Sequence, residues 1–365
     1  MKKFLSYFAV LFFALTMLSS CDKNDESDPY PSEQVKGCYI VNYGNYEKGG
    51  ASISKYDYTT GTMTNNYYKT QNNGLELLSN IQYIYKYNDQ IFMTGNAPDQ
   101  LITVDPLFVQ AKNGVTDQIA KPRACVASGN YLYISCLGTS PDWSAMPNTY
   151  LAKYNIKTRT VEKKISLPGG PEGLEIANGK LYAALNYKKA VAVINLSTEA
   201  ITYIETPAVT SYFVKDKTGN LYVSMVNSYA TPSQTTGLGY INTSSDKLET
   251  TYPLANVSTE YASIMTANSD YSKLYVITSQ YDANWNLSGA VSVFDVASKT
   301  FSSKSLISSI SGLKGITINP KDGNLYLFIG ESVTGAGLMK IYKPTGEFVK
   351  QESVGASPAM AIFLD

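Results

Sequence analysis

Short runs of alternating apolar and polar residues cover most of the chain, and the clearest example lies between residues 169 and 195. Apolar positions alternate there in three segments, 174–177, 180–185 and 190–195. A period of two is typical of strands, because successive side chains point to opposite faces of a sheet. Asn178-Gly179 separates the first two segments, and this dipeptide favours a tight hairpin. We therefore predict three consecutive antiparallel strands here.

The middle segment of this phrase recurs along the chain as an aromatic residue flanked by aliphatic ones. Seven copies are present, centred on Tyr39, Phe92, Tyr133, Tyr182, Tyr222, Tyr275 and Tyr326. From the first copy to the last, the aromatic residue advances 287 positions in six steps, or about 48 residues per step. A period of about 40 to 50 residues, with four short strands in each unit, is the signature of a β-propeller blade.

The two ends of the repeat region complement each other. The first copy has no strand before it that could serve as the innermost strand of its blade. The chain finishes with an apolar segment, 358–364, that has the pattern of an innermost strand without a successor. Pairing of the two would complete one blade and protect its edges. We predict an all-β fold, a seven-bladed β-propeller over residues 36–365, closed by pairing of the C-terminal strand with the N-terminal blade.

The first 20 residues have the pattern of a targeting segment. Lys2 and Lys3 precede an apolar run over 4–18, which is the arrangement of a signal peptide. The sequence LSSC at 18–21 resembles a bacterial lipobox, at which lipoproteins are cut before the cysteine. The resemblance implies removal of residues 1–20 and a lipid on Cys21, so that the protein is anchored to the membrane without spanning it.

Residues 21–35 are polar and contain two prolines, so we predict that they form a lipidated tether. The acidic run DKNDE at 22–26 resembles the export signal of surface-exposed lipoproteins in Bacteroidetes. That resemblance implies an outer-membrane location facing the cell exterior. The alternative is that the run is only a solvated part of the tether.

Composition excludes several kinds of chemistry. The chain has no histidine, so triads, general bases and metal sites built on histidine are excluded. It has 30 Lys and Arg against 30 Asp and Glu, and the resulting zero net charge predicts no nucleic-acid partner. Cys38, Cys125 and Cys136 lie in apolar strand patterns, without metal-type spacing, and are predicted to be buried thiols. The hairpin register places Cys125 opposite a residue near Ile134, so a disulfide with Cys136 would need a shift.

Three phrases resemble one propeller family: Pro122-Arg123 and GPEG at 170–173 before a first strand, and NGKLY at 178–182 after one. They are similar to those of YncE-like (YVTN-type) seven-bladed propellers, and the resemblance covers about residues 36–365. It implies the fold but not the function, because one fold hosts many functions. One branch in Bacteroidetes, the BtuG-type surface lipoproteins, is similar in build and captures cobalamin for a TonB-dependent transporter. No diagnostic motif places this chain in that branch.

In a propeller, the loops between second and third strands share one face with the loops that enter each new blade. Both tryptophans fall in loops of the first kind, and loops on a rigid scaffold often carry function. Trp and Tyr offer a large amphipathic contact area, so we predict ligand contact; the alternative is that each aromatic residue only pins its own loop. The candidates in these loops are Tyr43, Tyr46, Asp142, Trp143, Tyr229, Tyr281 and Trp285.

A second group of candidates begins the innermost strands around the entrance of the central funnel. Its members are Arg123, Glu172, Tyr212, Tyr261 and Lys314. Arg123 and Lys314 could contact anionic groups, for which the forked guanidinium is well suited. The alternative is that Arg123 and Glu172, on adjacent blades, form a structural ion pair.

The sequence contains no glycine-rich phosphate loop, no paired carboxylates at a recognisable spacing, no G-x-S-x-G elbow and no EF-type calcium loop. We therefore predict no catalytic residue, metal or cofactor. The interpretation is a surface lipoprotein that binds a small ligand and passes it to a TonB-dependent transporter, with a corrinoid as the ligand that the resemblance implies. The alternatives are a glycan-binding module, a protein-interaction scaffold, and a lyase or hydrolase of the propeller type.

Overall fold

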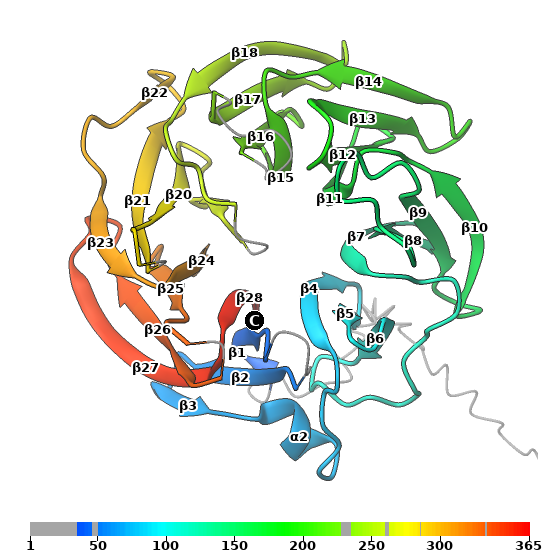
Figure 1. The fold of residues 1–365 in the computed structure, drawn as a ribbon. Coiled ribbons are helices and arrows are strands. Elements are labelled where there is room, and N and C mark those ends of the chain that lie inside the picture. Colours follow the sequence, from blue (N-terminus) through cyan, green and yellow to red (C-terminus); the bar gives the residue numbers. More distant parts are fainter. Residues whose placement is uncertain (1–34, 46–49, 228–234, 260–262, 285, 333) are drawn as a thin grey trace, which may run out of the picture.

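The computed structural model describes residues 35–45, 50–227, 235–259, 263–284, 286–332 and 334–365. Within them, seven antiparallel sheets stand side by side around a central axis (Figure 1), which is the predicted β-propeller. The described part contains no helix whose length and apolar character would suit a membrane span.

Blades 1 to 4 are named here from the innermost strand to the outermost. Blade 1 holds β28 (Pro358–Leu364), β1 (Gly37–Asn42), β2 (Ser52–Asp57) and β3 (Thr62–Thr64). Blade 2 holds β4 (Asn80–Tyr87), β5 (Gln90–Asn96) and β6 (Gln100–Val104), and the short helix α2 (Tyr67–Gln71) precedes it. Blade 3 holds β7 (Pro122–Ser128), β8 (Tyr131–Cys136), β9 (Tyr150–Asn155) and β10 (Thr160–Ser166). Blade 4 holds β11 (Pro171–Ala177), β12 (Lys180–Leu185), β13 (Ala190–Asn195) and β14 (Ile201–Glu205).

Blades 5 to 7 complete the ring. Blade 5 holds β15 (Val209–Lys215), β16 (Leu221–Val226), β17 (Gly237–Asn242) and β18 (Lys247–Pro253). Blade 6 holds β19 (Met265–Ala267), β20 (Lys273–Tyr281), β21 (Leu287–Asp295), β22 (Thr300–Phe301) and β23 (Ile307–Ser311), and both β22 and β23 pair with β21. Blade 7 holds β24 (Leu313–Ile318), β25 (Leu325–Ile329), β26 (Ala336–Tyr342) and β27 (Phe348–Ala356).

The repeated aromatic residue lies in the second strand of every blade, as predicted, and packs between neighbouring blades. Tyr326 of blade 7, for example, contacts Tyr56 and Phe363 of blade 1 edge-on, with ring centroids 6.1 and 5.4 Å apart. Burial of such a ring stabilises the fold by about 2–3 kcal/mol. The repeat is therefore the sequence signature of the layers that hold one blade to the next.

The two ends of the chain meet in blade 1. β28 pairs antiparallel with β1, from Gly37 opposite Leu364 to Asn42 opposite Pro358. β1 therefore has partners on both sides, β28 and β2.

Blade 2 departs from the repeat, and the prediction of four strands in every unit is wrong there. The segment after β6 makes only an isolated bridge, between Leu101 and Val115. Phe108 explains the difference, because it is fully buried against the ring of Tyr39, 4.5 Å away between centroids, in the core of blade 1. Asn72 donates to the Phe108 carbonyl oxygen, so this segment is held at α2 and away from the edge of its own sheet.

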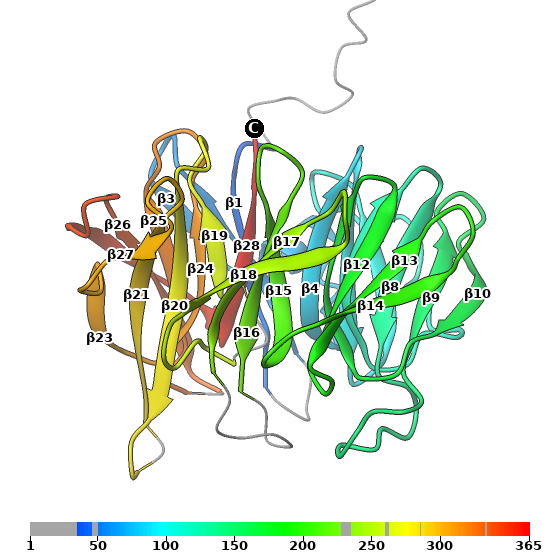
Figure 2. The same cartoon turned by 90° about the horizontal axis from the view of Figure 1, so that it is seen from above.

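Blade 6 differs from the sequence prediction between its second and third strands. Tyr281 is expected in the loop between them, whereas β20 runs through Tyr281 and β21 begins at Leu287. The Asp282 carboxylate accepts hydrogen bonds from the backbone N–H groups of Asn284 and Asn286. These bonds close a tight turn, so the two strands continue as a hairpin that projects beyond the ring (Figure 2).

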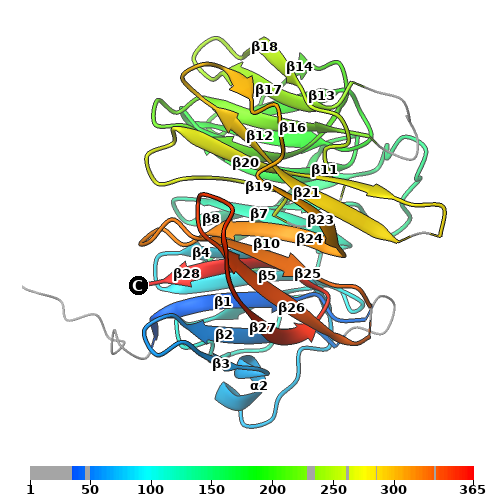
Figure 3. The same ribbon diagram turned by 90° about the vertical axis from the view of Figure 1, so that its left-hand side faces the viewer.

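The connections divide the propeller into two faces. The face that we call the hairpin face carries the C-terminus and the turns between first and second strands, such as Asn178-Gly179. The opposite face, called the loop face, carries the β8–β9 connection over 137–149 and the projecting β20–β21 hairpin (Figures 2 and 3). Val35, the first described residue, precedes β1 on the hairpin face. Tyr43, Asp142, Trp143 and Tyr281, the candidate loop residues that the structure describes, therefore lie on the side away from both ends of the described chain.

The junction of blades 7 and 1 predicts a sensitive glycine. A Cβ atom at Gly315 in β24 would lie 1.9 Å from the carbonyl oxygen of Ala359 in β28. We expect Gly315→Ala to lower the free energy of unfolding, measured with urea, by about 2 kcal/mol or more. Gly335→Ala is the control, because its Cβ would meet nothing closer than 3.4 Å. Equal stability of the two variants would show that the blades have room to separate.

The thiols give a second prediction. Cys38, Cys125 and Cys136 are free and buried, and Cys125 lies opposite Ile134, as predicted. Burial raises the pKa of all three, that of Cys136 to about 12. Because the thiolate is the reactive form, we expect peptide mass spectrometry to find these thiols unlabelled by iodoacetamide at pH 8 and fully labelled after denaturation. Rapid labelling of any of them in the folded protein would contradict this.

Candidate functional site

The innermost strands carry β-bulges near their loop-face ends, where the funnel residues were predicted. In six blades of the described part the pairing with the second strand shifts there. Bulges re-aim side chains and are common beside functional sites. The residues left out of register include Gln82, Arg123, Glu172, Tyr212 and Lys314.

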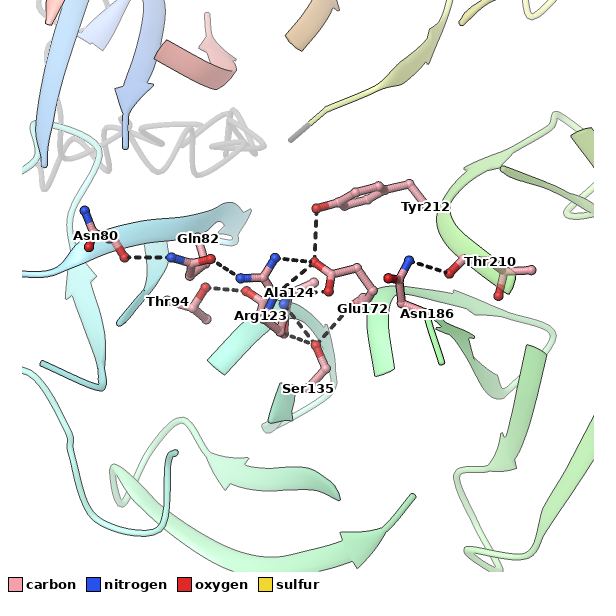
Figure 4. A network of polar contacts seen from close by, with 10 residues as sticks. All are labelled: Asn80, Gln82, Thr94, Arg123, Ala124, Ser135, Glu172, Asn186, Thr210 and Tyr212. Atoms are coloured by element: carbon pink, nitrogen blue, oxygen red, sulfur yellow. Dashed lines mark hydrogen bonds and ion pairs between the residues drawn. The ribbon is translucent and has the colours of Figure 1, made fainter. Parts of the chain in front are cut away.

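The bulges of blades 3 and 4 bring Arg123 and Glu172 together across the blade boundary. Arg123 donates from Nε to both carboxylate oxygens, at 3.1 and 3.0 Å, and from Nη2 to Oε1 at 2.8 Å. The side chains are only 8% and 4% exposed. Gln82 accepts from Nη1 of Arg123, and the Tyr212 hydroxyl donates to Glu172 Oε1 at 3.5 Å. Figure 4 shows this buried ion pair with a polar neighbour on each side.

Hydrogen bonds from second strands to the next innermost strand extend the network. Thr94 Oγ1 donates to the Arg123 carbonyl oxygen at 2.5 Å, and Ser135 Oγ donates to that of Glu172 at 2.9 Å. Asn186 Nδ2 makes the equivalent bond to the Thr210 carbonyl oxygen, at 3.3 Å. Each bond crosses one blade boundary, so the network in Figure 4 links blades 2 to 5. A bulge frees backbone carbonyls from the ladder, and these side chains satisfy them.

This arrangement decides which funnel groups are accessible. Arg123 and Glu172 form the structural ion pair that the sequence left open as an alternative, and their charges compensate each other away from solvent. Tyr212 is 9% exposed and packs in the core between blades 5 and 6. Lys314 lies half-buried in the bulge of β24. Ligand contact by these four residues stays a prediction.

The loop face presents Trp143 to solvent on a well-anchored loop. The side chain is 57% exposed. Three residues further on, Met146 is fully buried, and its carbonyl oxygen accepts from the Gly169 N–H at 2.9 Å. Tyr187, in the loop after β12, lies beside the indole, with ring centroids 6.4 Å apart and planes inclined at 54°. Two aromatic rings from adjacent blades therefore form a small platform, which we call the Trp143–Tyr187 platform.

Asp142 provides a charge next to this platform. Its Oδ1 accepts from the Ser144 hydroxyl at 2.6 Å and from the Ser144 N–H at 2.9 Å. These bonds hold the pKa of the Asp142 carboxyl below its usual value, because they favour the charged form. The carboxylate is exposed, so it can accept further hydrogen bonds from a ligand.

Two further loop candidates, Tyr281 and Tyr43, lie on the same face. Tyr281 is 49% exposed at the end of β20. Tyr43 follows β1, is half-buried, and donates its N–H to the Ser357 carbonyl oxygen at 2.9 Å. The remaining candidates lie outside the described residues: Cys21, Tyr46, Tyr229, Tyr261 and Trp285. In the described ranges no group of three or more Cys, Asp and Glu side chains is placed to hold a metal ion.

Sequence reasoning missed two residues of this region. Gln82 completes the ion-pair network, and its only signal is a polar residue in the apolar run NIQYIY of β4. Tyr187 completes the platform. Its signal in the sequence is an aromatic residue shortly after a second strand, in the short connection between β12 and β13. Both depend on contacts between blades, which the repeat pattern of one blade does not contain.

The fold and the site together define the class of protein, a seven-bladed β-propeller with a buried polar network at the funnel and exposed aromatic residues on the loop face. The family model described as Domain of unknown function (DUF5074) matches residues 36–364, and the chain belongs to that family. A search of the curated proteins finds no match.

Solved structures with similar folds come from several organisms. A quinonprotein alcohol dehydrogenase-like protein from Bacteroides thetaiotaomicron is 17% identical, with a TM-score of 0.66 over 91% of this chain and 79% of that one. Pseudomonas aeruginosa periplasmic gluconolactonase is 13% identical, with a TM-score of 0.60 over 90% and 99%. Kuenenia stuttgartiensis hydrazine synthase is 14% identical, with a TM-score of 0.60 over 74% and 85%. At such identities the likeness concerns the fold alone.

Loss of the buried Glu172 charge is expected to lower the free energy of unfolding more than loss of an exposed carboxylate charge. Glu172→Gln leaves the Arg123 guanidinium buried without its counter-charge, which costs about 3–5 kcal/mol of unfolding free energy. Glu347→Gln is the matched control, since its pair with Lys343 is 63% and 51% exposed and such pairs contribute about 1 kcal/mol or less. Urea unfolding of both variants checks this, and similar losses would mean that the Arg123 charge is solvated in the folded protein.

Proposed function

We propose that the protein is a surface-anchored lipoprotein of the outer membrane that captures a small ligand on its loop face for nutrient uptake. The observation that carries the proposal is the exposed Trp143, held beside Tyr187 and Asp142. Together, Trp143 and Tyr187 offer a large amphipathic contact area from two adjacent blades, as aromatic residues do in many binding sites. Because Met146 anchors the loop, little conformational entropy is lost when a ligand covers the indole.

The ligand is proposed to be larger than one ring. The 137–149 loop and the β20–β21 hairpin project from the same face on opposite sides of the ring (Figure 2), and both carry exposed aromatic residues, Trp143 and Tyr281. A corrinoid is the first candidate because of the family resemblance described for the sequence. With no histidine in the chain, its cobalt would not receive a protein imidazole, and binding would rest on contacts with the periphery of the macrocycle.

The position at which the tether joins the propeller supports ligand capture on the loop face. The predicted tether, residues 21–35, leads into β1 on the hairpin face. A lipid on Cys21 would therefore hold the hairpin face toward the membrane and leave the loop face turned to the medium or to a TonB-dependent transporter. About 14 residues extend to at most about 50 Å, so the tether would still permit reorientation during transfer.

Glycan binding is the second candidate, and Asp142 is the observation that favours it. Sugar rings stack on aromatic faces while their hydroxyls donate to carboxylates, and Asp142 presents an ionised carboxylate one residue from the indole. Hydrolysis or elimination has less support, because the Glu172 carboxylate at the funnel is buried and paired with Arg123, and it also accepts from Tyr212. A group in that state is a poor general base.

The platform predicts the effect of one truncation. Trp143→Ala is expected to weaken ligand binding by about 2 kcal/mol, or about 30-fold, as for other central aromatic contacts. The measurement is calorimetric titration of the full-length protein with a panel of corrinoids, followed by a glycan array. Phe348→Ala is the control, because Phe348 is 50% exposed in β27, the outermost strand of blade 7.

The titrations separate the versions of the proposal. Absence of heat with every corrinoid would overturn the corrinoid version and leave the array to decide on glycans. Binding of equal strength by wild type and Trp143→Ala would overturn the platform as the site.

A further inference from the structure

We infer that blade 1 binds a short, extended peptide at the place where its fourth strand is incomplete. A pocket of about 320 Å³ opens there, between the start of β2, helix α2 and the end of β27. This volume lies at the lower end of the range of small-molecule sites. The pocket is separate from the Trp143–Tyr187 platform at blades 3 and 4, so the inference goes beyond the proposed function and does not rest on it.

The hydrogen-bonded ladder of blade 1 has a gap at its outer edge. β3 pairs only with residues 55–57, in the second half of β2. In blades 3 and 5, by contrast, the fourth strand pairs with the third strand along its whole length. Residues 52–54 therefore have β1 on their inner side and, among the residues that the structure describes, no strand on their outer side.

This gap leaves backbone groups of β2 without a ladder partner. The N–H and C=O groups of successive residues in a strand point alternately to its two sides, so at least one of the three residues directs both groups outward. Ile53 and Ser54 are completely buried, and no backbone group in the described ranges bonds to residues 52–54 from the outer side. Buried backbone groups need a partner, and an added strand is the partner that fits a sheet edge.

The course of the chain after β3 leaves the space for such a strand. The Asn65 side chain accepts from Ser54 Oγ at 2.6 Å, and Asn66 has a left-handed backbone, with φ of 54°. The chain turns there into α2, which lies at the outer rim of the ring, outside β2 (Figure 1). Tyr68 of α2 and Ile53 of β2 both line the pocket, so the pocket separates the helix from the strand.

The rim of the pocket offers a partner for each end of a free peptide. Lys69 Nζ lies 2.7 Å from Glu76 Oε1, and the two side chains are 51% and 61% exposed. An exposed pair of this kind contributes little stability, so it opens at small cost. A peptide carries an α-ammonium and an α-carboxylate at neutral pH. The ammonium pairs with Glu76 and the carboxylate with Lys69, whereas a ligand with a single charge leaves one of the two without a counter-charge.

The pocket limits the length and the side chains of the peptide. Residues 52–54 span about 10 Å of strand, which corresponds to a peptide of two or three residues. Among the lining residues, Ala51 and Ala356 are small, and Ile53 and Leu77 are apolar. We therefore expect a preference for small apolar side chains, and tri-alanine is the simplest peptide of this kind.

The first test titrates the full-length protein with tri-alanine, followed by saturation-transfer difference NMR. We expect wild type to bind it and Ala356→Phe, which fills the pocket, to abolish the signal. Ala336→Phe is the control, because Ala336 is the cross-strand partner of Ala356 and does not line the pocket. Two N-methylated forms of tri-alanine, one at each amide nitrogen, test the strand geometry. At least one of them should bind about fivefold more weakly, because one N–H then no longer donates to β2.

The charged rim gives a second test, in which variants are matched with modified peptides. Lys69→Gln is expected to weaken binding of tri-alanine about fivefold and to leave binding of its C-terminal amide unchanged, because the amide has no carboxylate to pair. Glu76→Gln is expected to act in the same way on tri-alanine and its N-acetylated form. Lys343→Gln and Glu347→Gln are the controls, since this exposed pair lies in the turn between β26 and β27 and does not line the pocket.

Each result decides for or against the site. Binding by wild type, Ala336→Phe and Trp143→Ala, with loss in a folded Ala356→Phe, would support it. Failure of tri-alanine to bind wild type, or equal binding by Ala356→Phe, would overturn it. Undiminished binding of both N-methylated peptides, or equal weakening of tri-alanine and its amide by Lys69→Gln, would also contradict the inference. Loss of the signal in Trp143→Ala would place the peptide on the platform and overturn the site in blade 1. Corrinoid and glycan binding test the proposed function separately, so either can fail alone.

Discussion

Seven sheets can meet around one axis only if their innermost strands approach more closely than ordinary side chains allow. Two positions in the innermost strands have room only for glycine. A Cβ atom at Gly173 would lie 2.4 Å from the Ser211 carbonyl oxygen, and one at Gly315 would lie 1.9 Å from the Ala359 carbonyl oxygen. Such crowding leaves no space for a regular ladder, and the innermost strands form bulges at these points. The bulges in turn create the polar environment of the funnel, because they release backbone groups that side chains of the neighbouring blade then bond.

The Arg123–Glu172 pair follows from the same geometry. Removing both charges from water is costly, and a buried pair is weak evidence for stability. The pair contributes to the structure through the geometry of its hydrogen bonds. The Arg123 guanidinium donates to the Glu172 carboxylate on the following blade and to the Gln82 amide on the preceding blade. The pair thereby specifies how three consecutive blades are placed around the axis. It also removes the charges of Arg123 and Glu172 from contact with solvent, so the exposed polar and aromatic groups lie further out, in the loops.

Period-two patterns within one blade made the fold predictable, since each blade buries its own alternation and the aromatic residue marks the centre of every second strand. Departures from the pattern come from contacts between distant segments. Phe108 follows the last strand of blade 2 but packs in the core of blade 1. The tight turn at Asp282 makes a hairpin where the sequence predicts a loop. The site was predictable as a set of loops but not as a set of contacts. Trp143 was expected on the loop face, whereas its partner Tyr187 and the network partner Gln82 are set by the relative rotation of neighbouring blades, which sequence spacing does not encode.

A scaffold that fixes its blades this tightly confines variation to the connections, and the Trp143–Tyr187 platform occurs where a connection departs from the repeat. Loop 137–149 is extended and anchored by Met146, so it presents Trp143 without loosening blade 3. At the ring closure, β3 is short and α2 takes its place beside the start of β2, which leaves a pocket where a regular blade would be filled. Loop 137–149 lies on the loop face, whereas the described chain enters the propeller on the hairpin face. A protein held by its N-terminus would therefore keep the Trp143–Tyr187 platform away from its anchor, and a ligand bound there could be passed on without disturbing the buried network that holds the ring together.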